Sequence, residues 1–119
     1  MSDRAATAPG VVDQGAQELW DALGRARAEP APCTLSRVED ALFRHYLPIA
    51  LAMALAHAPD DPDPDAVRLV AETGLAQAIL SWRQGDSARF DRYARATITG
   101  QLCRHDRLTA IRQRRSASS

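Results

Sequence analysis

Apolar residues recur at three- and four-residue spacing along almost the whole chain, and no segment alternates convincingly between apolar and polar residues. That spacing places apolar side chains on one face of an α-helix, whereas a half-buried β-strand requires alternation. The pattern therefore predicts an all-α fold, a small bundle of about four helices over residues 12–28, 36–58, 65–82 and 87–108. A chain of 119 residues corresponds to one domain.

Prolines and a capping pattern mark the first boundaries between these helices. Pro30 and Pro32 end the first helix. Ser36 followed by Glu39 is a capping box, which predicts that the second helix starts there. Pro48 lies inside this second helix and predicts a kink.

The third helix and the two ends of the chain have signals of their own. Asp63 and Pro64 form an N-cap and a first-turn proline. Residues 1–11 are small and polar and residues 112–119 are basic and serine-rich, so we expect a disordered N-terminus and a flexible basic tail. The folded domain is then predicted over residues 12–111.

The sequence also excludes several classes of protein. It has no signal-peptide pattern and no apolar run of the roughly 18 residues that a membrane span needs. Cys33 and Cys103 are too few for a disulfide framework, and we expect them to be buried free thiols. A cytoplasmic protein with no membrane contact is the expectation.

No pattern typical of an enzyme occurs in the chain. There is no phosphate-binding glycine loop, no H-E-x-x-H and no nucleophile elbow. Cys103 and His105 are two residues apart on a helix and point to different faces. His45 and His57 have no acidic or sulfur partner at ligand spacing, and we expect them to be structural or exposed. We therefore expect no catalytic residues, no metal site, no cofactor and no small-molecule substrate.

Charge is distributed unevenly along the chain. Residues 1–65 carry five arginines and eleven acids, whereas residues 66–119 carry ten arginines and four acids. Within residues 83–115, arginines interleave with Phe90 and Tyr93. Arginine holds phosphates by paired hydrogen bonds, and aromatic rings stack on unpaired bases, so the pattern favours a nucleic-acid strand or an acidic partner. A solvated amphipathic helix with both rings in the core fits this charge pattern equally well.

Three sequence patches decide between these two interpretations. Residues 43–48 (FRHYLP) match R-x-Y-L-P, and residues 74–79 (GLAQAI) followed by Trp82 match G-L-x-x-A-I plus an aromatic. Residues 90–94 (FDRYA) match F-S-x-Y-A, and residues 97–102 (TITGQL) match T-I-x-G-E-[IL]. With these patches in order, the stretch from residue 42 to about residue 107 resembles region 2 of the sigma-70 family of RNA polymerase sigma factors, stress-response and sporulation type.

The resemblance implies a helical domain with two binding surfaces. In the family, one helix binds the clamp of core RNA polymerase and the next captures unpaired bases of the −10 promoter element. By position these surfaces correspond to residues 65–75 and 89–104. The candidate DNA-binding residues are Arg89, Phe90, Arg92, Tyr93, Arg95, Arg104 and Arg107. The candidate polymerase- or partner-binding residues are Asp65, Arg68, Leu69 and Glu72.

The sequence also departs from the family. Ala66, Leu69 and Ala71 stand where relatives carry an acid, a glutamine and a glycine that contact the polymerase. The chain has no helix-turn-helix region 4, so we expect no reading of a −35 element. Two hypotheses follow: a sigma-like transcription protein that binds promoter DNA, core RNA polymerase or both, or a sigma mimic that binds an anti-sigma factor or another regulator without polymerase. A purely structural remnant is a third, weaker alternative.

Overall fold

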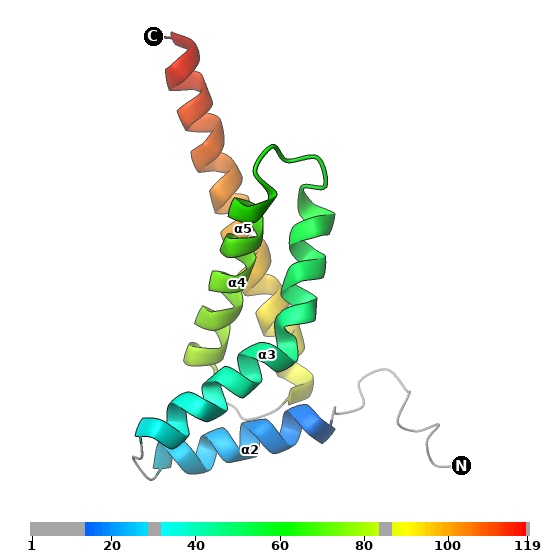
Figure 1. The fold of residues 1–119 in the computed structure, drawn as a ribbon, viewed down its shortest axis with the longest axis vertical. Coiled ribbons are helices and arrows are strands. Elements are labelled where there is room, and N and C mark those ends of the chain that lie inside the picture. The colour runs from blue at the N-terminus through cyan, green and yellow to red at the C-terminus, as the bar shows by residue number, and fades with distance from the viewer. Residues whose placement is uncertain (1–13, 29–31, 84–86, 119) are drawn as a thin grey trace, which may run out of the picture.

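The computed structural model describes residues 14–28, 32–83 and 87–118. They form four helices: α2 (Gln14–Ala28), α3 (Pro32–His57), α4 (Pro64–Ser81) and α5 (Ser87–Ser118). These ranges contain no strand, which confirms the predicted all-α bundle. In Figure 1 the second half of α3 runs beside α4 and α5, while α2 and the first half of α3 close the lower end. None of the described helices combines the length and apolar content that a membrane crossing requires.

Helix α2 packs an apolar face against the rest of the bundle. Its buried residues recur at the predicted three- and four-residue spacing: Ala16, Trp20, Leu23 and Ala26. The start predicted at residue 12 and the disorder predicted for residues 1–11 both lie outside the described residues.

Helix α3 begins earlier than predicted and bends in its middle. It starts at Pro32, so the predicted capping box was wrong, and Ser36 and Glu39 lie inside the helix. Proline suits the first helical position because its missing N–H would have no partner there. Pro48 lies inside α3, and the helix changes direction in its middle (Figure 1). Pro48 cannot donate to the carbonyl of Arg44, so the helical hydrogen-bond pattern is interrupted there and the helix can bend. The bent helix packs on both α2 and α4.

Helices α4 and α5 approach each other closely. The Asp63 carboxylate accepts a hydrogen bond from the Ala66 N–H at 3.2 Å, and Pro64 is the first helical residue, as predicted. A Cβ atom on Gly74 would lie only 3.1 Å from the Ile98 Cα, so the glycine allows the two backbones to meet. This contact fixes the side of α5 that faces the core.

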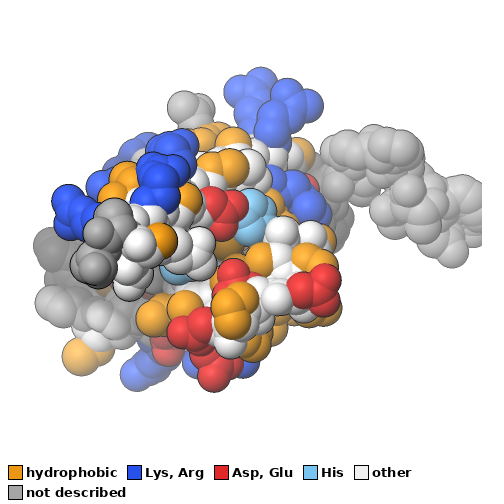
Figure 2. Space-filling view, turned by 90° about the horizontal axis from the view of Figure 1, so that it is seen from above, with side chains coloured by type: hydrophobic (Ala, Val, Ile, Leu, Met, Phe, Trp, Pro, Cys, Tyr) orange, Lys and Arg blue, Asp and Glu red, His pale blue; other side chains and the backbone are white. Residues whose placement is uncertain are grey.

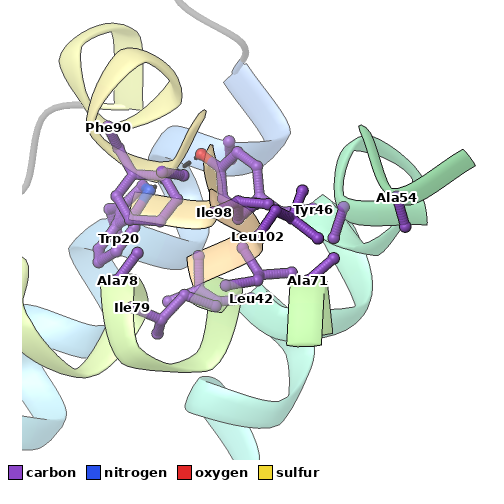
Figure 3. Close-up of a cluster of buried hydrophobic side chains, with 14 of the residues drawn as sticks. Trp20, Leu42, Tyr46, Ala54, Ala71, Ala78, Ile79, Phe90, Ile98 and Leu102 are labelled. Carbon is purple, nitrogen blue, oxygen red and sulfur yellow. Dashed lines mark hydrogen bonds between the residues drawn. The ribbon is translucent and has the colours of Figure 1, made fainter. Parts of the chain in front are cut away.

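An aromatic cluster fills the lower end of the core (Figure 3). The Phe90 ring lies 4.6 Å from the Trp20 ring and 4.8 Å from the Tyr46 ring, measured between centroids. Trp20 Nε1 donates a hydrogen bond to Tyr46 Oη at 3.0 Å. The cluster therefore joins α2, α3 and α5, and aliphatic residues extend the core from it: Leu23, Leu42, Leu75, Ile79, Ile98 and Leu102.

Helix α5 continues past its predicted end. Leu102 is its last buried residue, and His57 Nε2 lies 2.7 Å from Asp106 Oδ2 at the point where α5 leaves α3. Residues 112–118 are helical, where the sequence predicted a flexible tail. Side chains 111–117 are exposed, so this part of the helix lies outside the bundle core. Residues 107–118 are called the α5 extension below.

The two cysteines do not have the environment predicted for them. Cys33 and Cys103 are both free and exposed, not buried. Cys33 lies in the first turn of α3, and Cys103 lies on the outer side of α5 next to the buried Leu102. Both cysteines have apolar neighbours in the sequence, and those neighbours alone did not indicate whether each cysteine lies on the buried or the exposed side of its helix.

Candidate nucleic-acid interface

The basic charge predicted for the second half of the chain is concentrated on α5. The helix carries eight arginines and two aspartates. Because its core side faces α3 and α4, the described arginine side chains of α5 lie on its exposed surface. Their use as a phosphate-binding surface then depends on which of them share a face.

Two of the predicted arginines border an open hollow of about 580 Å³ at the start of α5. The hollow is lined by Trp82, Ala88, Arg89, Arg92, Tyr93 and Ala96. The Trp82 and Tyr93 rings lie 4.9 Å apart with their planes 33° from parallel. Tyr93 Oη lies 2.6 Å from Ser81 Oγ, and this hydrogen bond fixes the ring at the end of α4. Aromatic faces and guanidinium groups thus lie side by side, which is the chemistry that binds an unpaired base and its phosphate.

Trp82 is the member of this site that the sequence did not predict as a functional residue. Its indole N–H is buried without a hydrogen-bond partner among the described residues. Its carbonyl accepts a hydrogen bond from Arg27 Nη1 at 2.8 Å, and Arg27 Nη2 donates to the Ile79 carbonyl at 3.2 Å. Arg27 of α2 therefore satisfies the last carbonyls of α4 and holds the backbone that carries Trp82.

The guanidinium of Arg27 keeps its charge in this position. Burial lowers its pKa from the ordinary value, the nearby charge of Arg83 lowers it further, and Glu39 opposes the change. Arginine begins from so high a pKa that the group stays protonated near neutral pH. A charged donor at the end of α4 also matches the negative end of the helix dipole.

Phe90 was predicted to contact DNA, and the structure places it elsewhere. Its side chain is 0% exposed and packs among Trp20, Tyr46 and Trp82. A ring with no exposed surface cannot stack on a base without leaving the core. Phe90 instead supports Tyr93, whose ring centroid lies 6.4 Å away.

The remaining predicted arginines divide between two sides of α5. Arg89 and Arg107 are eighteen residues apart, which is about five full turns, so they share a face, and Arg92 and Arg104 lie near the same face. A strand held at the hollow could continue along this outer face toward Arg107, roughly 27 Å away along the helix axis. These four arginines form one candidate phosphate track.

Arg95 lies outside the track. It is nine residues from Arg104, half a turn out of phase, and its Nε lies 3.2 Å from the Asp91 carboxylate. Arg95 and Arg104, both predicted to bind DNA, therefore leave the helix on opposite sides. Arg95 is three residues from Arg92, so it lies beside the Arg92 end of the track and opposite Arg104.

The predicted partner-binding residues lie together on the exposed part of α4. Arg68 pairs with Asp65 at 3.2 Å and with Glu72 at 3.8 Å. Leu69 beside them is 62% exposed, and Leu80, three turns along the same face, is 52% exposed. Two uncovered leucines beside a linked charge cluster resemble a protein-binding surface more than a solvated helix face.

Comparisons with protein-family models, with curated proteins and with solved structures each gave no match for this chain. Its function is therefore inferred from the residues of these two surfaces together with the sequence motifs.

Proposed function

We propose that the chain is a cytoplasmic, sigma-like transcription protein that captures unpaired bases of −10 promoter DNA on α5 and has no enzymatic activity. The observation that carries the proposal is the hollow, in which Arg89, Arg92 and Tyr93 lie together with Trp82. An unpaired base stacks on the Tyr93 ring, while the two guanidinium groups hold the flanking phosphates. The strand then follows the outer face of α5.

The arrangement of rings favours single-stranded over duplex DNA. A base must leave its stack to lie against Tyr93, and this costs nothing extra in an unpaired strand but a few kcal/mol in a duplex. The hydrogen bond between Tyr93 and Ser81 and the contact with Trp82 hold the receiving ring in place before DNA arrives. A ring held in advance loses little side-chain entropy on binding.

A binding titration tests this function directly. A fluorescent oligonucleotide containing a −10-like sequence should bind more tightly as a single strand than as a duplex. Affinity should fall with salt on a log–log slope of about three, because the four track arginines each contact one phosphate and each contact releases ~0.7 counterion. Arg92→Gln should remove about one phosphate contact from the slope, whereas Arg95→Gln should change the slope less, because Arg95 is paired with Asp91 and points away from Arg104. A chain that ignores single-stranded DNA at low salt would refute the proposal.

A second function has an observation of its own. The exposed Leu69 and Leu80 favour a protein partner on α4, either core RNA polymerase or, in a sigma mimic, an anti-sigma factor. Arg68 is already held by Asp65 and Glu72, so Leu69 supplies the uncovered apolar contact. Leu69→Glu should weaken capture of the partner by this surface and leave single-stranded DNA binding unchanged. Purified core RNA polymerase and a purified anti-sigma factor, tested separately, distinguish the two partners.

A further inference from the structure

The upper end of the molecule carries two features that the hollow at the start of α5 does not use. One is the α5 extension, which projects past the bundle (Figure 1). The other is an apolar groove of about 280 Å³ between the end of α3 and the start of α4. Residues lining this hairpin groove include Leu51, Leu55, Pro59, Pro64, Asp65 and Arg68.

These two features have opposite charge. The turn and first helical residues at positions 60–65 carry four aspartates and no arginine. The α5 extension carries four arginines and no acid. Seen from above, most acidic side chains gather in one part of this end and most arginines in another (Figure 2). The four aspartates of one copy can therefore balance the four arginines of another copy, and a pair of these neutral chains is neutral as well.

Both features also leave apolar surface uncovered. Leu55 at the groove is 70% exposed, and Leu108 and Ile111 near the start of the extension are 46% and 40% exposed. A helix of this length is marginal in water by itself, because too few hydrogen bonds offset the cost of starting it. A surface that covers Leu108 and Ile111 would therefore stabilise the extension as a helix.

We propose that two copies of the chain pair about a two-fold axis, with the α5 extension of each lying in the hairpin groove of the other. Leu108 and Ile111 then cover Leu55 and the groove, and Arg112 faces the aspartates of residues 60–65. Both features lie at the same end of the molecule, so one rotation satisfies both contacts and the assembly closes as a dimer. The dimer contains this contact twice, once from each copy, so the total buried area is doubled.

This pairing is compatible with the DNA site and does not depend on it. Arg92 and Arg112 are twenty residues apart, about 30 Å along α5. Leu108 and Arg112 are turned about 100° and 140° from Arg107, whereas Ile111 lies one turn beyond Arg107 on the same face. Each chain of a dimer therefore keeps its own hollow with Arg89 and Arg92, while Arg107 lies at the edge of the pairing surface.

Sedimentation equilibrium of the full chain tests the pairing. The wild-type chain should be a dimer at about 50 mM salt and should dissociate more readily at about 500 mM, since a shorter Debye length screens the exposed charges. Arg112→Glu should weaken dimerisation roughly tenfold or more, because two symmetric contacts each lose an attraction and gain a repulsion. The double variant Arg112→Glu with Asp60→Arg should restore it.

Two further variants keep the test specific. Leu55→Gln should also weaken the dimer while circular dichroism shows unchanged helix content, since the side chain is already largely exposed. Arg25→Glu on α2, at the other end of the molecule, should leave the dimer intact. A monomer at all salt concentrations, a dimer that Arg112→Glu leaves unchanged, or assemblies that keep growing with concentration would each overturn the proposal.

Discussion

Replacing Phe90 tests whether this residue belongs to the core or contacts DNA. We expect Phe90→Ala to lower the free energy of unfolding by about 3–5 kcal/mol, the usual range for a fully buried phenylalanine. The ring has no exposed surface and contacts Trp20 and Tyr46 within 5 Å, so little of the cavity can close. For a domain of about 100 residues with a stability of roughly 5–15 kcal/mol, that is a large fraction of the total.

The milder variant Phe90→Leu carries the decisive comparison. Leucine keeps most of the buried volume and loses the ring contacts; the two within 5 Å are each worth about 0.5–1.5 kcal/mol, so the expected loss is about 1–3 kcal/mol. Urea denaturation measures it conveniently, because the protein has two tryptophans and both lie against Phe90. Fluorescence and circular dichroism should report the same transition.

Single-stranded DNA binding of the folded Phe90→Leu variant should stay within about twofold of wild type. A residue that stacks on a base would instead cost about 1–3 kcal/mol of binding. Unchanged stability together with a large loss of DNA affinity would refute the placement of Phe90 in the core. It would also return the residue to the DNA surface, where the motif resemblance placed it.

Three further substitutions test other contacts. Arg27→Ala should lower the free energy of unfolding by about 1–3 kcal/mol in thermal or urea denaturation, because the two carbonyls at the end of α4 lose a charged donor. Gly74→Ala should destabilise by about 1–3 kcal/mol, since its Cβ would press on the backbone of α5, whereas Gly100→Ala, with open space around it, should stabilise by up to about 1 kcal/mol. In surface plasmon resonance, Ala66→Asp with Leu69→Gln should raise affinity for core RNA polymerase if α4 has lost the polar contact that sigma factors make at these positions. No change or weaker binding would mean that other residues of α4 have replaced that contact.

The helices could be predicted because their signal is local. The spacing of apolar residues and the positions of prolines can be interpreted without knowing the rest of the fold. Together with the capping aspartate, they predicted the bend at Pro48 and the cap at Asp63. The capping box failed because Ser36 and Glu39 fit the pattern while the helix had already started at Pro32. The helical part of residues 112–118 was missed because their arginines and serines form no apolar face, although such residues do not prevent a helix from continuing.

The site could be predicted only in part, because it depends on packing between distant segments. Phe90 and Tyr93 are three residues apart on one helix, and their spacing does not indicate which ring meets Trp20. Once α2 covers Phe90, Tyr93 remains at the surface beside Trp82. The separation of Arg95 from Arg104 could have been predicted, since helical phase alone places them on opposite sides of one helix.

The central claim is that Tyr93 receives an unpaired base, and one affinity measurement tests it most directly. Fluorescence anisotropy with a single-stranded −10-like oligonucleotide at low salt should show Tyr93→Ala binding about 5- to 150-fold more weakly than wild type, equivalent to about 1–3 kcal/mol. Tyr93→Phe, which keeps the ring and loses only the hydrogen bond to Ser81, should bind within a few-fold of wild type. Equal binding by wild type and by a folded Tyr93→Ala variant would contradict the account.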